Sequence, residues 1–443
     1  MMYHQKFISD ETGHGLFASK KIKSSSTDIE TNKMITFLDN KSCKTNCSQC
    51  LDTYNYLKRC SRCKQVKYCS EKCQRNGWNV HRLACSYLSQ IPSTSAVPPL
   101  IRLCALFLYS SDLKTEFCIN NLMNHDISEN EKLHEYYPFV LKGVSELLKS
   151  VLSNINPIEI YEIYSKLVVN LFTLEDGNLK TIGSVMMPAI SKMNHSCDPN
   201  CVISYNGRNA YITAIKDINI DSELTISYVP LPMSFLNRKT QLLYQFNFTC
   251  QCSLCSKQRD EKADHMITRE CSVCKVSVCP KIDLLNDELF CPICTSIFVK
   301  LQEDNENTSD TIVSTGSELS TEPKAVKDVD IVNHLIEKTE ILILEKRWEY
   351  ALVTGLRAVD GILDWAQYYP STGLFTAKMG KLYLEQECSS LLVQKYNVSR
   401  ALHMFETSLK CLSVSLPSNH KIIMEVECLY KSTNDTMKNN NWQ

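Results

Sequence analysis

Asn194-His195-Ser196-Cys197-Asp198-Pro199-Asn200 is the stretch of this 443-residue chain that decides its fold. Asp198-Pro199-Asn200 is a turn signal, and the alternation in Ala210-Tyr211-Ile212-Thr213-Ala214 predicts a strand soon after it. A second short run, Glu223-Leu224-Thr225-Ile226-Ser227-Tyr228, follows. The first stretch is therefore a polar loop beside predicted strands, and it carries side chains that can bind a ligand or a metal.

Three further cysteines give this loop a metal partner. They have the spacing C-x-C-x2-C and are Cys250, Cys252 and Cys255. A tetrahedral zinc site needs four ligands, and Cys197 is the natural fourth. Closing that site would pin the Asn194-His195 loop against the segment Phe246-Asn247-Phe248. The zinc ion would then be structural, yet it would shape a pocket.

Eight more candidate ligands lie in four pairs within residues 47–85. Gaps of two or three residues let a tight turn aim paired thiolates at one ion, and two ligands four residues apart share one helix face. Eight ligands are enough for two zinc sites. The expected pairing is interleaved, with Cys47, Cys50, Cys69 and Cys73 on one ion and Cys60, Cys63, His81 and Cys85 on the other. Trp78 is expected to fill the small core between them.

A fourth zinc site is predicted by a C-x2-C…C-x2-C ribbon pattern. Its expected ligands are Cys271, Cys274, Cys291 and Cys294. Cys279 is either a competing ligand or an ordinary buried thiol. Such a ribbon would brace the catalytic part of the chain against its C-terminal helices.

These motifs resemble two known families. The spacing C-x2-C-x9-C-x2-C-x5-C-x3-C-x7-H-x3-C is similar to the MYND zinc finger. The NHSCDPN and ELTISY runs and the C-x-C-x2-C triplet match the SET-domain lysine methyltransferases in order and spacing. Residues 7–16 look like the opening strand and Gly-rich turn of that family. Together the motifs resemble the SET-and-MYND (SMYD) family over nearly the whole chain.

The resemblance implies an S-adenosyl-L-methionine-dependent protein-lysine N-methyltransferase that acts on histone or non-histone lysines by in-line methyl transfer. Such an enzyme binds the cofactor, desolvates the lysine and aligns its amine with the methyl group. The resemblance implies that Tyr228 is catalytic and orients the amine. It implies cofactor contacts from Thr12, Gly13, His14, Gly15, His125, Asn170, Asn194, His195, Tyr228, Phe246 and Phe248.

Each of these residues also has a plainer interpretation when taken alone. Tyr228 and Phe248 would serve equally as core aromatics, Asn170 as a polar residue at a helix end, and His195 as a structural histidine. The alternative for the whole chain is a MYND and helical-repeat scaffold, or a transcriptional cofactor, with weak or no methyltransferase activity. The joint presence of Asn194, His195 and Tyr228 favours the enzyme.

The expected fold class is α+β, with a SET β-fold that is split by a MYND finger and a helical insert. The helical patterns include residues 137–152 and 157–172, while the polar segment 20–30 suggests that the second strand, at residues 34–38, is displaced. The expected domains are 1–46 (N-terminal part of SET), 47–85 (MYND), 86–182 (helical insert), 183–245 (core SET), 246–270 (post-SET zinc segment), 271–302 (zinc ribbon), 303–329 (acidic flexible linker) and 330–443 (TPR-like helices).

Composition limits the cellular compartments and the binding partners to be expected for the chain. The 23 cysteines could suggest a secreted disulfide scaffold, but their metal-like spacing and the polar N-terminus favour reduced thiolates in the cytoplasm and nucleus. The net charge of −1 predicts neither strong nucleic-acid binding nor membrane binding for the whole chain, and we expect a monomer. The MYND resemblance implies binding of proline-rich peptides. Nine Lys/Arg against two Asp/Glu between Lys44 and Cys85 would also allow weak contact with nucleic acid.

Overall fold

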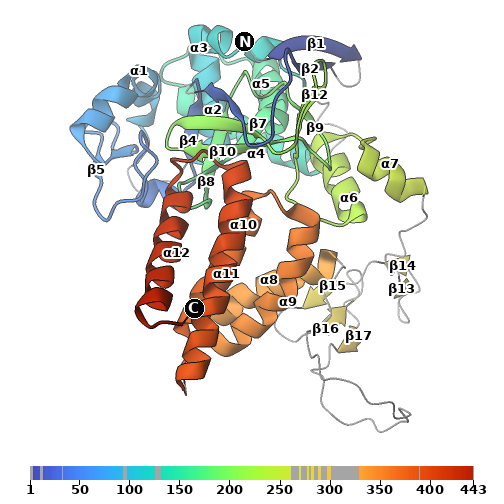
Figure 1. Ribbon diagram of the computed structural model, residues 1–443. Helices are drawn as coiled ribbons and strands as arrows, with labels where there is room; N and C mark the ends of the chain where they lie inside the picture. Colours follow the sequence, from blue (N-terminus) through green and yellow to red (C-terminus); the bar gives the residue numbers. More distant parts are fainter. Residues whose placement is uncertain are drawn as a thin grey trace.

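Figure 1 shows the computed structural model of the chain. It describes residues 3–9, 13–31, 33–92, 97–124, 131–260, 329–388 and 390–442, together with five short strands between residues 269 and 300. These strands are β13 (Arg269–Glu270), β14 (Ser277–Val278), β15 (Lys281–Asp283), β16 (Glu288–Phe290) and β17 (Ile297–Lys300). The predicted ribbon ligands, Cys279 and the predicted linker over residues 303–328 lie outside the described residues.

The first sheet joins the two ends of the predicted SET region. Its strand order is β1 (Tyr3–Ser9), β2 (Gly13–Ala18), β12 (Glu223–Ile226) and β9 (Asn194–His195). Strand β12 pairs antiparallel with β2 and parallel with β9. The Gly-rich turn, the Asn194-His195 loop and the run that ends in Tyr228 are therefore neighbours, although they are about 200 residues apart in sequence.

Two three-stranded sheets complete the β-part of this region. One has the order β10 (Cys201–Asn206), β11 (Asn209–Ala214) and β3 (Thr27–Thr31), and the other has the order β4 (Ile35–Leu38), β8 (Thr181–Met186) and β7 (Leu171–Glu175). The strand expected at residues 210–214 is thus present as β11. The strand expected at residues 34–38 is present as β4. A further strand, β3, forms at the end of the polar segment and pairs with β11.

Five helices fill the region between β6 and β7. They are α1 (Glu71–Leu88), α2 (Pro99–Tyr109), α3 (Ser111–Glu116), α4 (Glu131–Leu148) and α5 (Pro157–Asn170). Helix α2 is the centre of their core, with Leu103, Leu106 and Phe107 at most 1% exposed. The helical pattern expected to reach residue 172 ends at Asn170 instead, because Leu171 and Phe172 enter the β7–β8 ladder.

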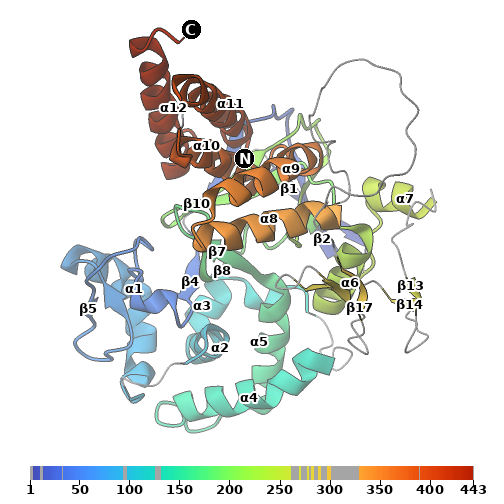
Figure 2. The same cartoon turned by 90° about the horizontal axis from the view of Figure 1, so that it is seen from below.

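The C-terminal part consists of helices that each pack on the next in sequence. They are α8 (Val329–Leu344), α9 (Trp348–Ala366), α10 (Pro370–Glu385), α11 (Leu391–Ser415) and α12 (Lys421–Asn439). Glycines allow close packing here, since a Cβ on Gly380 would lie 2.6 Å from the Phe405 ring. Figure 2 shows these helices on one side of β7 and β8, with α1–α5 on the other. No helix in the described part of the chain is long and apolar enough to cross a membrane.

The remaining described elements are short and connect the larger ones. They are η1 (Ser42–Lys44), β5 (Lys58–Arg59), β6 (Lys67–Tyr68), η2 (Ile119–Asn121), α6 (Phe235–Phe246) and α7 (Ser253–Asp260).

Candidate active site and zinc sites

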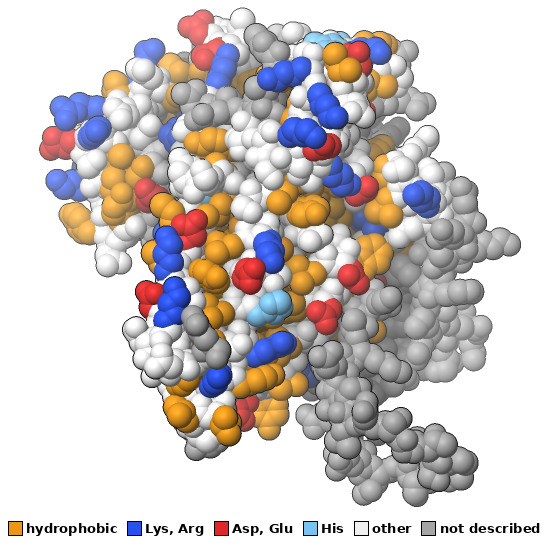
Figure 3. Space-filling view, in the orientation of Figure 1, with side chains coloured by type: hydrophobic (Ala, Val, Ile, Leu, Met, Phe, Trp, Pro, Cys, Tyr) orange, Lys and Arg blue, Asp and Glu red, His pale blue; other side chains and the backbone are white. Residues whose placement is uncertain are grey.

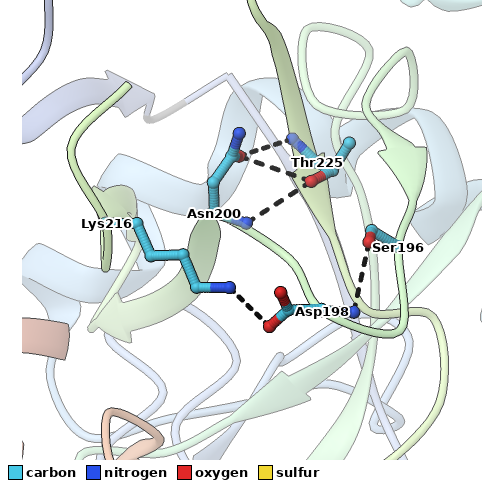
Figure 4. A network of polar contacts seen from close by, with 5 residues as sticks. All are labelled: Ser196, Asp198, Asn200, Lys216 and Thr225. Carbon is cyan, nitrogen blue, oxygen red and sulfur yellow. Dashed lines mark hydrogen bonds and ion pairs between the residues drawn. The ribbon is translucent and has the colours of Figure 1, made fainter. Parts of the chain in front are cut away.

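The NHSCDPN loop is held in place by its own polar residues. Asn200 holds β12 in place, because its Nδ2 donates to the Glu223 carbonyl at 2.8 Å. Its Oδ1 also accepts from the Thr225 amide at 2.9 Å (Figure 4). The Asp198 amide donates to Ser196 Oγ at 3.1 Å, and the Asp198 carboxylate pairs with Lys216. The predicted turn therefore fixes the strand that carries Tyr228 at its end.

Four cysteines converge beside this loop. The sulfur atoms of Cys197, Cys250, Cys252 and Cys255 all lie within 4.8 Å of one another, and the group packs against Val229, Leu242 and Phe246. Hydrogen bonds that Cys197 shares with the other three sulfurs raise the pKa of its thiol well above the ordinary value. Four such sulfurs can all be thiolates only with a cation among them, and a set of four soft thiolates fits zinc.

His195 joins this cysteine group to Tyr228. Its Nδ1 accepts a hydrogen bond from the Tyr228 amide at 3.0 Å, and its Nε2 lies 3.2 Å from Cys197 Sγ. Burial lowers the pKa of His195 to about 4, so the ring is neutral. Since Nδ1 accepts, the ring proton is on Nε2 and points to the sulfur, an arrangement that orients a metal ligand from outside its coordination shell.

Aromatic rings surround Tyr228. The ring centroid of Phe246 lies 5.0 Å away, that of His195 5.4 Å and that of Phe248 6.4 Å, with Phe248 edge-on. The Tyr228 hydroxyl donates to the Met193 carbonyl at 2.7 Å. Burial, and the charge of Glu223, raise the pKa of Tyr228 above its ordinary value. The hydroxyl therefore stays protonated at neutral pH and can orient a ligand but cannot serve as a strong base.

The Gly-rich turn comes close to this site. Gly13 has a φ of +72°, which a residue with a Cβ rarely adopts. A Cβ on Gly15 would lie 2.5 Å from Glu223 Oε1 and 3.1 Å from Asn194 Nδ2. His14 lies next to them and is exposed, with its ring 5.4 Å from that of Phe7. Gly13 is thus favoured by its backbone conformation, and a side chain at Gly15 would displace the Glu223 carboxylate.

The other expected cofactor residues fall into two groups. Asn170 is buried at the end of α5, where its Nδ2 donates to the carbonyls of Met123 and Lys166, both at 2.8 Å. Asn170 is therefore a polar residue at a helix end, as its plainer interpretation expected. Its hydrogen bond to Met123 also connects α5 to the segment before residue 125. Thr12 and His125 lie outside the described residues.

Glu223 is a site residue that the sequence analysis did not single out. Its carboxylate accepts a hydrogen bond from Asn194 Nδ2 at 2.7 Å, and it faces Gly15. The available signal was period-two alternation, which places an acidic residue near the start of β12 beside the two glycines. Sequence alone did not give the pairing of β12 with both β2 and β9.

The finger region brings together the eight ligands in the interleaved grouping. Cys47, Cys50, Cys69 and Cys73 form one group within 4.8 Å, and Cys60, Cys63, His81 and Cys85 form the other. Burial lowers the pKa of His81 to about 4, which leaves its ring neutral and its lone pair free to ligate. Burial raises the pKa of Cys85 to about 12, so a metal ion must displace its proton. Both groups have the donor chemistry of structural zinc sites.

The expectation for Trp78 was wrong. Its side chain is 41% exposed, and its ring touches His81 only edge-on at a centroid distance of 5.8 Å. Tyr68, which is 2% exposed, occupies the core beside His81 instead. Helical spacing places Trp78 on the same side of α1 as His81 and Cys85, but Tyr68 from β6 fills the core there and the Trp78 ring is left at the surface.

Comparison with known proteins agrees with this geometry. A family model described as "SET domain" matches residues 13–229 of the chain. Histone-lysine N-methyltransferase SMYD3 of Homo sapiens is 30% identical over 292 residues, which are 61% of this chain and 65% of that protein. N-lysine methyltransferase SMYD2-A of Danio rerio is 24% identical over 399 residues, 86% of this chain and 89% of that protein. The chain is thus similar to named SMYD lysine methyltransferases over most of its length.

The extent of these similarities differs. The chain spans less than two thirds of the length of SMYD3, and histone-lysine N-methyltransferase ASHR1 of Arabidopsis thaliana is matched over 56% of its length at 29% identity. Among solved structures, "Structure of Rubisco LSMT bound to AdoMet" covers 98% of this chain and is matched over 87% of its own length. Its identity of 11% and TM-score of 0.35 are too low to establish a common fold over the whole length.

Proposed function

We propose that this protein is an S-adenosyl-L-methionine-dependent protein-lysine N-methyltransferase. The observation that carries the proposal is the position of Tyr228 within the region that matches a SET domain: its half-buried ring lies among the rings of Phe246, Phe248 and His195. The names of the relatives SMYD3 and SMYD2 support the same activity.

The residues proposed to hold the cofactor are Thr12, Gly13, His14, Gly15, His125, Asn170, Asn194, His195, Tyr228, Phe246 and Phe248. Of these, the glycines and His14 lie on β2, Asn194 and His195 form β9, and Tyr228 follows β12. When bound, S-adenosyl-L-methionine supplies a methyl group on a sulfonium, which is a good electrophile. The two glycines let the main chain approach the cofactor closely, and the aromatic rings exclude water from it.

The chain's own contribution is to prepare and place the lysine amine. Only the neutral amine has a free lone pair, and an apolar channel lowers the pKa of a lysine because it disfavours the charged form. Phe172, Phe246 and Phe248 are proposed to supply that surface. The protonated Tyr228 hydroxyl retains oxygen lone pairs that can accept an amine N–H and hold the amine in line. No residue has to remove a proton during the transfer itself, since the amine arrives neutral.

The zinc ions are proposed to be structural. Two lie in the finger and one beside the Asn194-His195 loop, where His195 links it to Tyr228. A fourth is proposed for the ribbon of Cys271, Cys274, Cys291 and Cys294. Metal analysis of the whole protein should find about four zinc ions per chain. A result of three zinc ions per chain would argue against the ribbon site, and a result of two or fewer would contradict the ligand assignments.

The substrate and partners are proposed from the relatives and from the surface. SMYD3 is named a histone-lysine methyltransferase and SMYD2 an N-lysine methyltransferase, so histone and non-histone lysines are both proposed substrates. Lys and Arg side chains gather over β5 and α1 (Figure 3), and this positive charge supports weak contact with nucleic acid. Binding of proline-rich peptides by the finger is proposed in addition. A monomer in the cytoplasm and nucleus, with TPR-like C-terminal helices that limit access to the cleft, completes the proposal.

Two measurements test the proposed activity. Calorimetry should detect binding of S-adenosyl-L-homocysteine to the whole protein. Incubation with methyl-labelled cofactor and a panel of histones and cytosolic proteins should then label a substrate, and the Tyr228→Phe variant should fail to label it. No binding and no Tyr228-dependent labelling would refute the enzyme. Binding without labelling of any protein would favour a scaffold with an inactive centre.

A further inference from the structure

Glu223 lies where three separate segments of the site meet. It is the first residue of β12, which pairs with β2 on one side and β9 on the other. Its Oε1 accepts a hydrogen bond from Asn194 Nδ2 at 2.7 Å. The same oxygen occupies the space that a Cβ on Gly15 would need. The sheet thus brings the two residues into contact, and a side chain at position 15 would displace the Glu223 carboxylate.

The carboxylate decides which way the Asn194 amide faces. An ionised carboxylate only accepts hydrogen bonds, so Asn194 must present its NH2 group and not its oxygen. The Nδ2 atom also lies 3.4 Å from the His14 carbonyl, which is a second acceptor. Both hydrogens of the amide are therefore directed at the protein.

The amide oxygen is left available as a result. Within the residues that the structure describes, no group donates a hydrogen bond to Asn194 Oδ1. A half-buried amide oxygen, held by a carboxylate, is suited to a ligand that is a hydrogen-bond donor and preferably a cation.

The position of Glu223 is itself fixed. Asn200 Nδ2 donates to the Glu223 carbonyl. Asn200 Oδ1 accepts from the Thr225 amide two residues along (Figure 4). The main chain of β12 is therefore held at the point where the Glu223 side chain leaves it. The loop that carries Asn194 thus also locates the carboxylate that orients Asn194.

We propose that Glu223 is a positioning residue for cofactor binding, which fixes the Asn194 amide so that its Oδ1 accepts from the protonated α-amino group of S-adenosyl-L-methionine. The inference rests on the proposed function and adds to it one residue, Glu223, whose carboxylate sets the orientation of the Asn194 amide. It concerns ligand binding, and it can be measured without methyl transfer.

The test compares two ligands by calorimetry on the whole protein. S-adenosyl-L-homocysteine carries the α-amino group, whereas 5′-methylthioadenosine has the same adenosine and thioether but no amino-acid group. In Glu223→Gln the neutral amide no longer forces one orientation on Asn194. The affinity for S-adenosyl-L-homocysteine should fall about 10-fold, while that for 5′-methylthioadenosine should change less than about 2-fold. Glu425→Gln on α12 is the control, and both affinities should stay unchanged in it.

A double-mutant cycle separates positioning from a general loss of structure. If Glu223 acts through Asn194, then Glu223→Gln should cost almost nothing further in an Asn194→Ala background. Three outcomes would overturn the inference and leave the proposed function standing. The first is that the losses of affinity in the two variants add up, and the second is that Glu223→Gln weakens both ligands equally. The third is that Glu223→Gln binds S-adenosyl-L-homocysteine as tightly as the parent does. If the parent protein bound S-adenosyl-L-homocysteine in no measurable way, the proposed function would fail and the inference with it.

Discussion

Tyr228 shows at the residue scale how burial determines chemistry. Its hydroxyl has a fixed partner in the Met193 carbonyl, and its raised pKa keeps the proton on the oxygen. In Tyr228→Phe the ring still fills the aromatic cluster, but nothing orients the amine. We expect the rate of methyl transfer to fall about 100-fold or more, with S-adenosyl-L-homocysteine affinity within about 3-fold of the parent. Single-turnover rates and calorimetry measure the two effects, and an undiminished rate would contradict the role.

Glu175 gives a pH-dependent prediction. It lies at the end of β7, and burial, followed by the charge of Asp176, raises its pKa from 4.5 to about 7. Between these two pH values the folded state holds a proton that the unfolded state has lost, so Glu175 makes the fold less stable as pH rises. Glu175→Gln does not titrate. Its stability relative to the parent should therefore rise by about 2–3 kcal/mol between pH 5 and pH 8.

Urea unfolding of both proteins at each pH measures this difference, and comparison at equal pH cancels the titration of the zinc ligands. Glu385→Gln, at an exposed position on α10, is the control for loss of a carboxylate. A constant difference across the pH range would show that Glu175 titrates normally.

The sequence alone was enough to assign residues whose type and spacing indicate a metal site. Cys197 and the eight finger ligands were grouped correctly, because metal ligands must lie at short, regular intervals. Glu223 and Tyr68 were missed, and Trp78 was misplaced. The roles of these three depend on which strand or helix face lies opposite them, and one chain read in order does not contain that information.

At the scale of elements, the cysteine group beside α6 and α7 is expected to hold the cofactor pocket in shape. Cys197 precedes β10, while the other three ligands follow α6, so one ion joins the NHSCDPN loop to Phe246 and Phe248. Cys252→Ser should remove one zinc ion per chain and weaken S-adenosyl-L-homocysteine binding at least about 10-fold. Metal analysis and calorimetry test this, with Cys118→Ser, at an exposed cysteine, as control. Normal cofactor affinity with one zinc fewer would refute the account.

Element boundaries were predictable only in part. The pattern over residues 157–172 is helical throughout, yet α5 stops at Asn170 because the next residues gain ladder hydrogen bonds to β8. Helical periodicity shows only which residues of a segment share one helix face. It gives no sign that a strand elsewhere in the chain can pair with the last residues of that segment. The strand at residues 210–214 was easier to predict, because the alternation of its residues and the turn before it both indicate a strand.

At the scale of the whole molecule, one histidine ties the C-terminal helices to the SET region. His420 has no exposed surface; its Nε2 lies 3.1 Å from the Tyr205 carbonyl on β10, and its Nδ1 accepts from the Ile422 amide at the start of α12. His420→Ala would lose both hydrogen bonds and leave a cavity. We expect unfolding to become easier by about 2–4 kcal/mol and the C-terminal helices to be cleaved faster by protease.

The exposed His403 on α11 provides the matched control, and His403→Ala should change neither stability nor cleavage appreciably. Equal behaviour of the two variants would mean that the two regions are held together elsewhere. The contact between His420 and Tyr205 joins residues 215 apart in sequence, which is why no pattern in the chain pointed to it.

The central claim is that the Asn194-His195 loop, Tyr228 and the surrounding aromatic rings transfer a methyl group to lysine. The most direct measurement is mass spectrometry of a protein substrate after incubation with the whole chain and methyl-labelled S-adenosyl-L-methionine. We predict labelled methyl groups on lysine Nζ with the parent protein and none above background with Tyr228→Phe. Label on another residue type, or equal labelling by both proteins, would contradict the claim.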